Sequence, residues 1–208
     1  MNEAVVLIHG IWMTGIEMRP LGRRIQQAGF EVHYFHYHSL LRSPAENAER
    51  LHRYLQTMDA TVIHLVAHSL GGIVVAQLFD RHPAQKPGRV IMLGTPLRGS
   101  AVARNYQRWF LTRPLLGKST VNGLLGDGPR WNRGRQLCVI AGNRGFGIGS
   151  LLPGELPAPN DGTVALEETR DRSVAEHLEV PYSHFGMLLA RPVAEAVVGC
   201  LKTGSFGV

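Results

Sequence analysis

The chain has 208 residues, which suits one compact domain around a single buried core. Hydrophobic residues make up 44% of it and charged residues 18%, a balance that excludes an intrinsically disordered chain. No apolar run approaches the roughly 20 residues that span a bilayer. The first residues have neither the basic stretch nor the cleavage site of a secretory signal, so we expect a cytoplasmic protein.

The net charge of +6 is unevenly distributed. Residues 98–144 contain nine Lys or Arg side chains and a single acid, Asp127. Such a segment can attract anionic surfaces. Weak association with an anionic membrane is therefore one hypothesis, and an ordinary solvated face is the other. No nucleic-acid partner is expected, because no helix-turn-helix, zinc or aromatic-stacking motif accompanies the arginines.

Short apolar runs alternate with helical patterns along the chain. The expected strands are residues 4–8, 30–35, 61–67, 89–93, 136–141 and, more weakly, 177–180. Continuous apolar runs are typical of strands that helices cover on both faces. The alternation predicts a doubly wound α/β fold, with a mostly parallel sheet of about six strands and helices on both faces. Without internal repeats, residues 1–208 are expected to form one domain.

The expected helices have recognisable ends. One stops at Gly29, and the next opens with a capping box from Ser43 to Glu46. A third follows Ser69 and is closed by Pro83, and the last ends near Gly204. Residues 98–135 are too long for a simple connection, and functional loops often have this length. They are therefore expected to form a cap or entrance region.

Ser69 is the candidate nucleophile. It lies between the strand at 61–67 and the helix that follows, on a sharp turn that exposes its hydroxyl at the carboxyl edge of the sheet. Such a turn requires small residues two positions before and two after the serine, which are Ala67 and Gly71 here. The helix N-terminus also directs free amides toward the site, which suits a developing oxyanion.

Three motifs resemble those of the α/β-hydrolase superfamily, in particular its small, lid-poor lipases and esterases. They are Val-Leu-Ile-His-Gly at 6–10, Ala-His-Ser-Leu-Gly-Gly at 67–72 and Gly-Thr-Pro-Leu-Arg-Gly-Ser at 94–100. The resemblance implies hydrolysis of carboxylic esters through an acyl-enzyme on Ser69. It also implies an oxyanion hole made by the backbone amides of Ile11 and Leu70. Trp12, next to this loop, is expected either to line the acyl pocket or simply to pack.

A serine nucleophile needs a base, and the superfamily order places an acid and then a histidine after it. Three of the ten histidines follow Ser69. His184 lies just past the last expected strand and is the favoured base. His177 lies at the beginning of that strand, at the wrong edge of the sheet, and His82 ends the helix after the nucleophile.

The acid is expected after the strand at 136–141. Asp161, in an Asn-Asp-Gly turn, is favoured, with Glu155 and Asp171 as alternatives. Its role would be to hold one imidazole tautomer and stabilise the imidazolium without taking a proton. Asn-Asp-Gly is also an ordinary turn sequence, so the assignment depends on position and resemblance together.

Two further patterns suggest cofactors but are set aside. The glycine-rich residues 142–149 open no helix, so they lack the context of a nucleotide loop. His33, His36 and His38 have no cysteine or carboxylate nearby to complete a zinc site. No cofactor and no metal are expected.

The expected partner is a small-molecule or lipid ester. A thioesterase or a phospholipid deacylase would use the same groups, and a non-catalytic binding protein of the same fold is the remaining alternative. The natural substrate, the acyl-chain length and the oligomeric state are left open.

Overall fold

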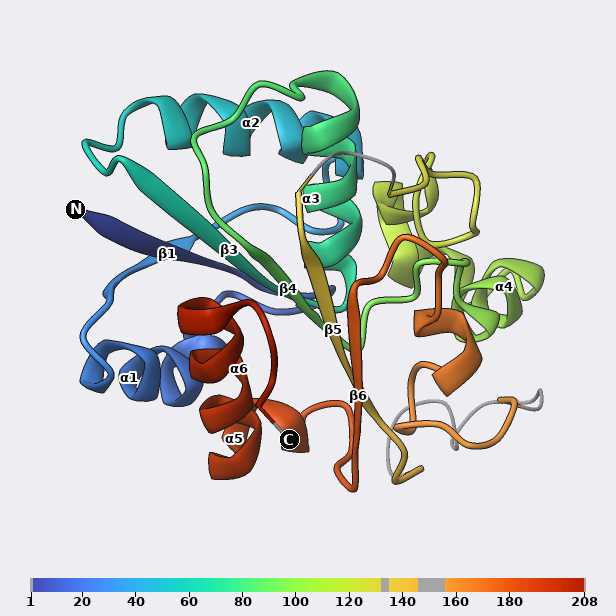
Figure 1. Ribbon diagram of the computed structural model, residues 1–208. Helices are drawn as coiled ribbons and strands as arrows, with labels where there is room; N and C mark the ends of the chain where they lie inside the picture. Colours follow the sequence, from blue (N-terminus) through green and yellow to red (C-terminus); the bar gives the residue numbers. More distant parts are fainter. Residues whose placement is uncertain (1, 132–134, 146–155, 208) are drawn as a thin grey trace.

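A six-stranded, wholly parallel sheet forms the centre of the protein, in the order β2-β1-β3-β4-β5-β6. A computed structural model describes residues 2–131, 135–145 and 156–207 (Figure 1). The strands are β1 Glu3–Ile8, β2 Glu31–Phe35, β3 Val62–His68, β4 Val90–Leu93, β5 Leu137–Gly142 and β6 Glu176–Val180. Each expected strand is confirmed to within one or two residues at its ends.

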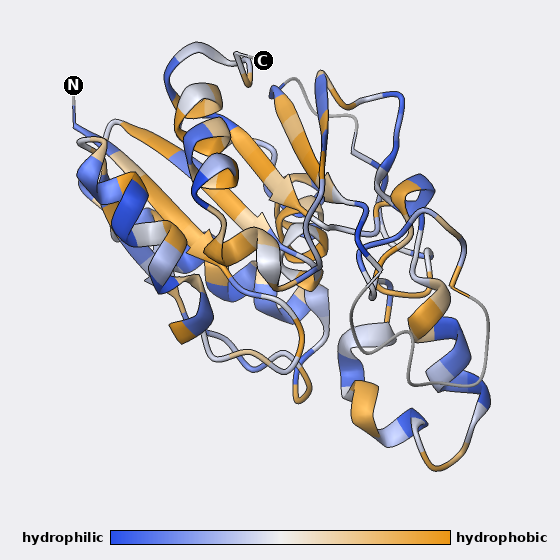
Figure 2. Ribbon diagram, turned by 90° about the horizontal axis from the view of Figure 1, so that it is seen from below, coloured by the Kyte–Doolittle hydropathy of each residue, from blue (hydrophilic) through white to orange (hydrophobic). Residues whose placement is uncertain are grey.

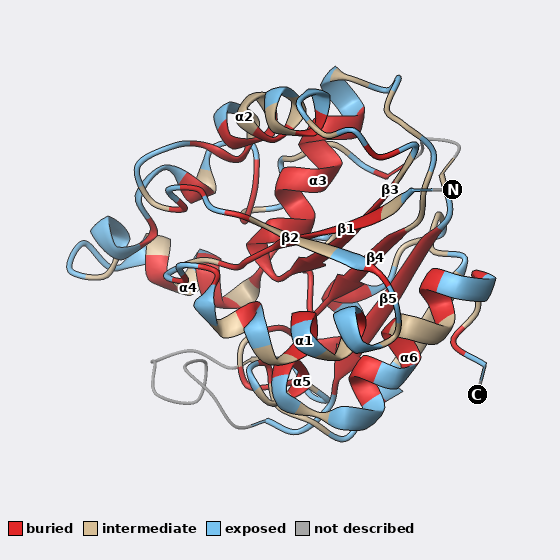
Figure 3. Cartoon of the chain, turned by 90° about the vertical axis from the view of Figure 1, so that its left-hand side faces the viewer, coloured by how far each residue is buried: buried red, intermediate tan, exposed pale blue. Residues whose placement is uncertain are grey.

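Helices cover both faces of the sheet. On one face lie α2 (Pro44–Gln56) and α3 (Leu70–Arg81), and on the other lie α1 (Arg19–Gln27), α5 (Gly186–Leu189) and α6 (Arg191–Thr203) (Figure 1). The central strands lie between these two layers of helices. They and α3 are almost entirely buried (Figure 3). Burial on both faces explains why these strands are continuously apolar. The doubly wound α/β fold expected from the sequence, with a parallel sheet of six strands, is confirmed.

The helix ends also agree with the sequence. Ser43 and Glu46 form the capping box of α2: Ser43 Oγ accepts from Glu46 N at 3.2 Å, and Glu46 Oε2 accepts from Ser43 N at 2.7 Å. Helix α3 ends at Arg81, two residues before Pro83, and Gly204 caps α6 in a left-handed conformation. No helix in the described part of the chain is long and apolar enough to cross a membrane.

The segment 98–131 lies at the carboxyl edge of the sheet. It contains α4 (Ala101–Arg108) and the 3-10 helix η2 (Arg113–Thr120), and forms a lobe beside the strand ends (Figures 1 and 2). Another 3-10 helix, η4 (Leu166–Thr169), is hydrogen-bonded to this lobe, because Glu168 Oε1 accepts from Ala101 N at 2.6 Å. The lobe therefore lies at the edge where parallel strands present a binding site.

Candidate active site

Ser69 lies on the tight turn between β3 and α3. Its backbone has φ 54° and ψ −122°, a conformation that costs a non-glycine residue about 1–3 kcal/mol. Two hydrogen bonds hold the turn: Ser69 N donates to Leu93 O at 2.9 Å, and Thr95 Oγ1 donates to Ser69 O at 3.0 Å. The structure thus maintains a strained serine at the carboxyl edge, as a nucleophile turn requires.

Gly71 lies directly against the end of β1, where a side chain would not fit. A Cβ atom on Gly71 would lie 2.5 Å from the carbonyl oxygen of Ile8 and 2.6 Å from that of His9. This contact explains physically why a small residue is required two positions after Ser69. It also brings the loop after β1 next to the N-terminus of α3.

The two predicted oxyanion donors lie on either side of this contact. Leu70 is the first residue of α3, so its amide has no partner within the helix. Ile11 follows Gly10, and a Cβ on Gly10 would lie 3.1 Å from Ser69 Cβ. The two backbone segments that carry the predicted donors thus flank Ser69, which is compatible with an oxyanion hole.

His184 and Asp161 form a buried pair. His184 Nδ1 lies 2.6 Å from Asp161 Oδ2, and the two residues are 4% and 1% exposed. Asp161 Oδ1 accepts from the backbone amides of Thr163 and Val164, at 2.9 Å and 2.7 Å, which stabilises the carboxylate charge. His184 N also donates to Asp161 O at 2.9 Å, so backbone and side chain both fix the pair.

The turn after β4 supports the imidazole of His184. Gly94 has φ 56°, and a Cβ atom there would lie 2.9 Å from His184 Nδ1. Glycine is needed at this position both for its backbone conformation and for the close approach of the ring. The Gly-Thr-Pro motif that begins at Gly94 therefore contacts both His184 and Ser69, because Thr95 Oγ1 donates to Ser69 O.

His68 is a site residue that the sequence analysis did not single out. Its Nε2 lies 3.1 Å from His184 O, and the two imidazole rings are 4.4 Å apart. Burial and the neighbouring His184 hold the pKa of His68 well below its ordinary value. Its position next to Ser69 in the motif was the available signal, but nothing in the pattern indicated its partner.

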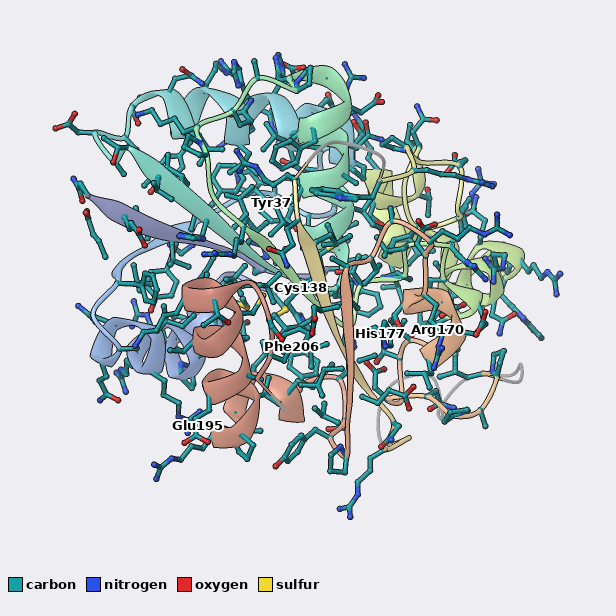
Figure 4. All side chains as sticks on the ribbon, in the orientation of Figure 1. Tyr37, Cys138, Arg170, His177, Glu195 and Phe206 are labelled. Atoms are coloured by element: carbon teal, nitrogen blue, oxygen red, sulfur yellow. The ribbon has the colours of Figure 1, made fainter. Side chains whose placement is uncertain are left out.

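The alternative bases have other partners. His177 Nε2 lies 2.9 Å from Thr169 Oγ1, near the start of β6 and beside Arg170 (Figure 4). His82 Nε2 pairs with Glu49 Oε2 of α2 at 2.9 Å, at the C-terminal end of α3. Neither is brought to the Asp161–His184 pair.

Of the alternative acids, Asp171 is used locally: its Oδ1 accepts from the amide and the hydroxyl of Ser173, at 2.9 Å and 2.5 Å. Glu155 lies outside the described residues, as do positions 146–149 of the glycine-rich segment. Within the described residues, no group of three or more His, Cys, Asp or Glu side chains is arranged to hold a metal ion.

A cavity of about 590 Å³ opens beside the loop after β1. Its lining residues are Trp12, Met13, Thr14, His36, Tyr37, His38, Ser39, Leu40, Leu41 and Arg50. Trp12 has a left-handed backbone, with φ 57°, and its Nε1 donates to Leu115 O at 2.7 Å in the lobe. Trp12 therefore lines a cavity and also joins the predicted oxyanion loop to the lobe.

The sheet order and the strained turn between β3 and α3 are those of the α/β-hydrolase fold expected from the sequence. The chain belongs to the family described as a domain of unknown function, DUF7379, whose model matches residues 3–117. No curated protein matches the sequence.

Several solved structures have the same fold. One is the mature lipase BlEst2 of Bacillus licheniformis, with 19% identity and a TM-score of 0.70 over 97% of this chain and 91% of that one. The ydeN gene product of B. subtilis has 16% identity and a TM-score of 0.68, over 98% and 100% of the two chains. Carboxylesterase CesB of Bacillus subtilis has 11% identity and a TM-score of 0.64, over 98% and 85%. At these identities the similarity concerns the fold.

Proposed function

We propose that the protein is a serine hydrolase that cleaves carboxylic esters through an acyl-enzyme on Ser69. The observation that supports this most directly is the 2.6 Å bond between His184 Nδ1 and Asp161 Oδ2. This buried pair lies at the same sheet edge as the strained turn of Ser69. A histidine oriented by a carboxylate, at the same sheet edge as a serine on a strained turn, supports nucleophilic catalysis.

In the proposed reaction, His184 Nε2 takes the proton of Ser69 Oγ as the oxygen attacks the carbonyl carbon of the ester. The amides of Ile11 and Leu70 hold the oxyanion, and each such donor typically contributes about 3–4 kcal/mol to transition-state stabilisation. The tetrahedral adduct collapses, and His184 gives the proton to the leaving alcohol. Water, activated by the same histidine, then releases the carboxylic acid, while Asp161 stabilises the imidazolium.

The similar structures and the cavity near the site support carboxylic esters as the substrate class. Similar structures include a protein described as a lipase and another described as a carboxylesterase. The largely apolar cavity beside the loop after β1 suits an acyl or alkyl chain. Thioester or phospholipid hydrolysis would use the same groups, and rates on matched ester and thioester substrates separate these activities.

The lobe at 98–131 is, in this proposal, the entrance to the site and the place where the protein meets anionic lipid. Its tip exposes three consecutive apolar residues, Trp109, Phe110 and Leu111, between two cations, Arg108 and Arg113. Exposed apolar groups flanked by cations are typical of surfaces that bind anionic bilayers.

A fluorophosphonate probe, which labels activated serines covalently, tests the proposed function. Labelling of the wild-type protein and none of Ser69→Ala is the expected result. Ser69→Ala should also lose nearly all hydrolysis of an activated ester while keeping the fold, because the triad acts as a unit. Residual hydrolysis above about a tenth of wild type would reject Ser69 as nucleophile. An unlabelled wild-type protein would favour the non-catalytic binding protein.

A further inference from the structure

The cavity beside the loop after β1 lies between three segments. They are the turn at residues 12–14, the loop at residues 36–41 after β2, and helix α2, which contributes Arg50. Trp12, Met13 and Leu40 supply apolar surface, and Arg50 supplies a guanidinium. The cavity is therefore apolar with a cationic group at one side.

The cavity wall reaches the nucleophile through Gly10. A Cβ atom on Gly10 would lie 3.1 Å from both Ser69 Cβ and Met13 Sδ. Met13 is held in this place because its Sδ accepts from Gly10 N at 3.2 Å. Gly10 thus lies between Met13 of the cavity wall and the proposed nucleophile, and the cavity adjoins the Ser69 turn.

Arg50 has no anionic partner. Its Nε is buried, lacks a hydrogen bond, and no carboxylate of residues 2–131, 135–145 or 156–207 forms an ion pair with it. A buried N–H without a partner is energetically unfavourable and favours any ligand that supplies an acceptor.

The nearby acids are occupied by other donors. Glu17 accepts from the amides of Thr14 and Gly15, at 3.2 Å and 3.0 Å. Glu46 is held in the capping box by Ser43, and Glu49, one residue before Arg50, accepts from His82 at 2.9 Å. None of these three carboxylates is therefore paired with Arg50.

We propose that this cavity binds a carboxylate or phosphate group of the ester substrate, and that Arg50 is the residue that selects it. Both groups present paired oxygens that a guanidinium can bind in a bidentate manner. The apolar walls take the short chain between this anion and the scissile ester. The inference rests on the proposed esterase function, because it assigns the substrate class of the same site.

Two esters of equal chain length test the selection. The mono-4-nitrophenyl ester of adipic acid has a free carboxylate, and 4-nitrophenyl hexanoate has none. The wild-type protein should prefer the adipate ester in kcat/KM, chiefly through a lower KM. Arg50→Gln should reduce this preference about tenfold, because a charge-assisted hydrogen bond to the adipate carboxylate is lost. Arg50→Lys should keep part of the preference.

Arg53→Gln is the matched control. Arg53 is one turn further along α2, is exposed, and does not line the cavity, so its loss should leave the preference unchanged. An equal preference in wild type and Arg50→Gln would overturn the inference, as would an equal effect of Arg53→Gln.

Calorimetric titration with hexanoate, hexyl phosphate and neutral 1-hexanol separates this inference from the proposed function, because it needs no catalysis. The two anions should bind wild type and Arg53→Gln at least about tenfold more tightly than Arg50→Gln, and 1-hexanol should not distinguish the proteins. The tighter of the two anions identifies the group. Binding of both anions no tighter than 1-hexanol would overturn the inference even if both esters are hydrolysed.

Discussion

The imidazole of His68 lies 3.1 Å from the backbone oxygen of His184, and it connects the nucleophile turn to the loop that carries the proposed base. His68 Nδ1 has no hydrogen-bond partner among the residues that the structure describes, while Nε2 faces a carbonyl oxygen, so Nε2 carries the proton and donates it. His68 immediately precedes Ser69, so this bond relates the position of His184 to that of the serine. We infer that His68 is a positioning residue.

Replacing His68 by phenylalanine should therefore lower kcat about tenfold or more with little change in KM, because a displaced base affects only the chemical step. His68→Gln keeps an N–H donor and should retain more activity. Ester kinetics of both variants, with their melting temperatures measured in parallel, check this prediction. Equal losses in the two variants would mean that His68 acts through packing rather than through its hydrogen bond.

His184→Ala and Asp161→Asn should both impair ester hydrolysis, the histidine change more severely. His184 moves protons in every step, whereas Asp161 orients and stabilises it. Asp161→Asn leaves the backbone bond from His184 N to Asp161 O available, so the loop should keep its place. The control is His177→Ala, whose side chain contacts Thr169 instead. If the His177 variant lost more activity than the His184 variant, the assignment of the base would be wrong.

Local patterns were sufficient for the fold. Strands such as β3 and β5 are continuously apolar because helices bury both their faces, and the capping box at Ser43 specifies where α2 begins. The turn at Ser69 was predictable for the same reason, since a small residue, a serine and a glycine at fixed spacing satisfy a local steric rule. These signals depend on neighbours within a few positions along the chain.

The remaining features depend on contacts between distant residues. In the sequence, Arg50 is one of the two arginines of a well-capped helix. Its place in the cavity depends on the loop after β2 and on the turn at residues 12–14, which is distant in the chain. The bond from His68 to His184 joins residues 116 positions apart. The predicted roles of Asp161 and His184 relied on superfamily order, because no local pattern indicates that their side chains meet. Their catalytic roles stay predictions until the variants are measured.

The protein should lose stability as the pH falls below about 6.5, the pKa of a histidine in an unfolded chain. Burial lowers the pKa of His68, and also those of His9 and His64, in the folded state. Below pH 6.5 the unfolded chain then binds more protons than the folded one, so acid favours unfolding, and above it this effect vanishes. His68, which is almost fully buried, should contribute to this loss of stability.

Urea denaturation at pH 7.5 and 5.5 measures this loss. His68→Gln removes one buried titrating group and should reduce the difference in the free energy of unfolding between the two pH values. His38→Gln, which replaces an exposed histidine, should leave the difference unchanged. Equal stability of the wild-type protein at both pH values would contradict the prediction.

The tip of the lobe should bind anionic vesicles. Trp109, Phe110 and Leu111 are 55%, 82% and 72% exposed, and Arg108 and Arg113 lie beside them in the chain. Each cation near an anionic bilayer contributes roughly 1 kcal/mol, and the apolar side chains add burial at the headgroup boundary. Co-sedimentation should show more protein bound to phosphatidylglycerol-containing vesicles than to phosphatidylcholine vesicles. The difference should shrink at high salt, because exposed charges are screened within about 10 Å at 0.1 M.

Two variants identify the surface responsible. Phe110→Ser should lower the bound fraction at either salt concentration, because it removes the most exposed apolar side chain of the tip. Hydrolysis of a short, water-soluble ester should change less than vesicle binding, since Phe110 has no role in the proposed chemical step. Leu189→Ser removes a side chain that is 60% exposed on α5, away from the lobe, and should leave binding unchanged. Equal and negligible sedimentation with both kinds of vesicle would mean that the basic lobe is a solvated surface, and the proposed ester hydrolysis would then act on dissolved substrates.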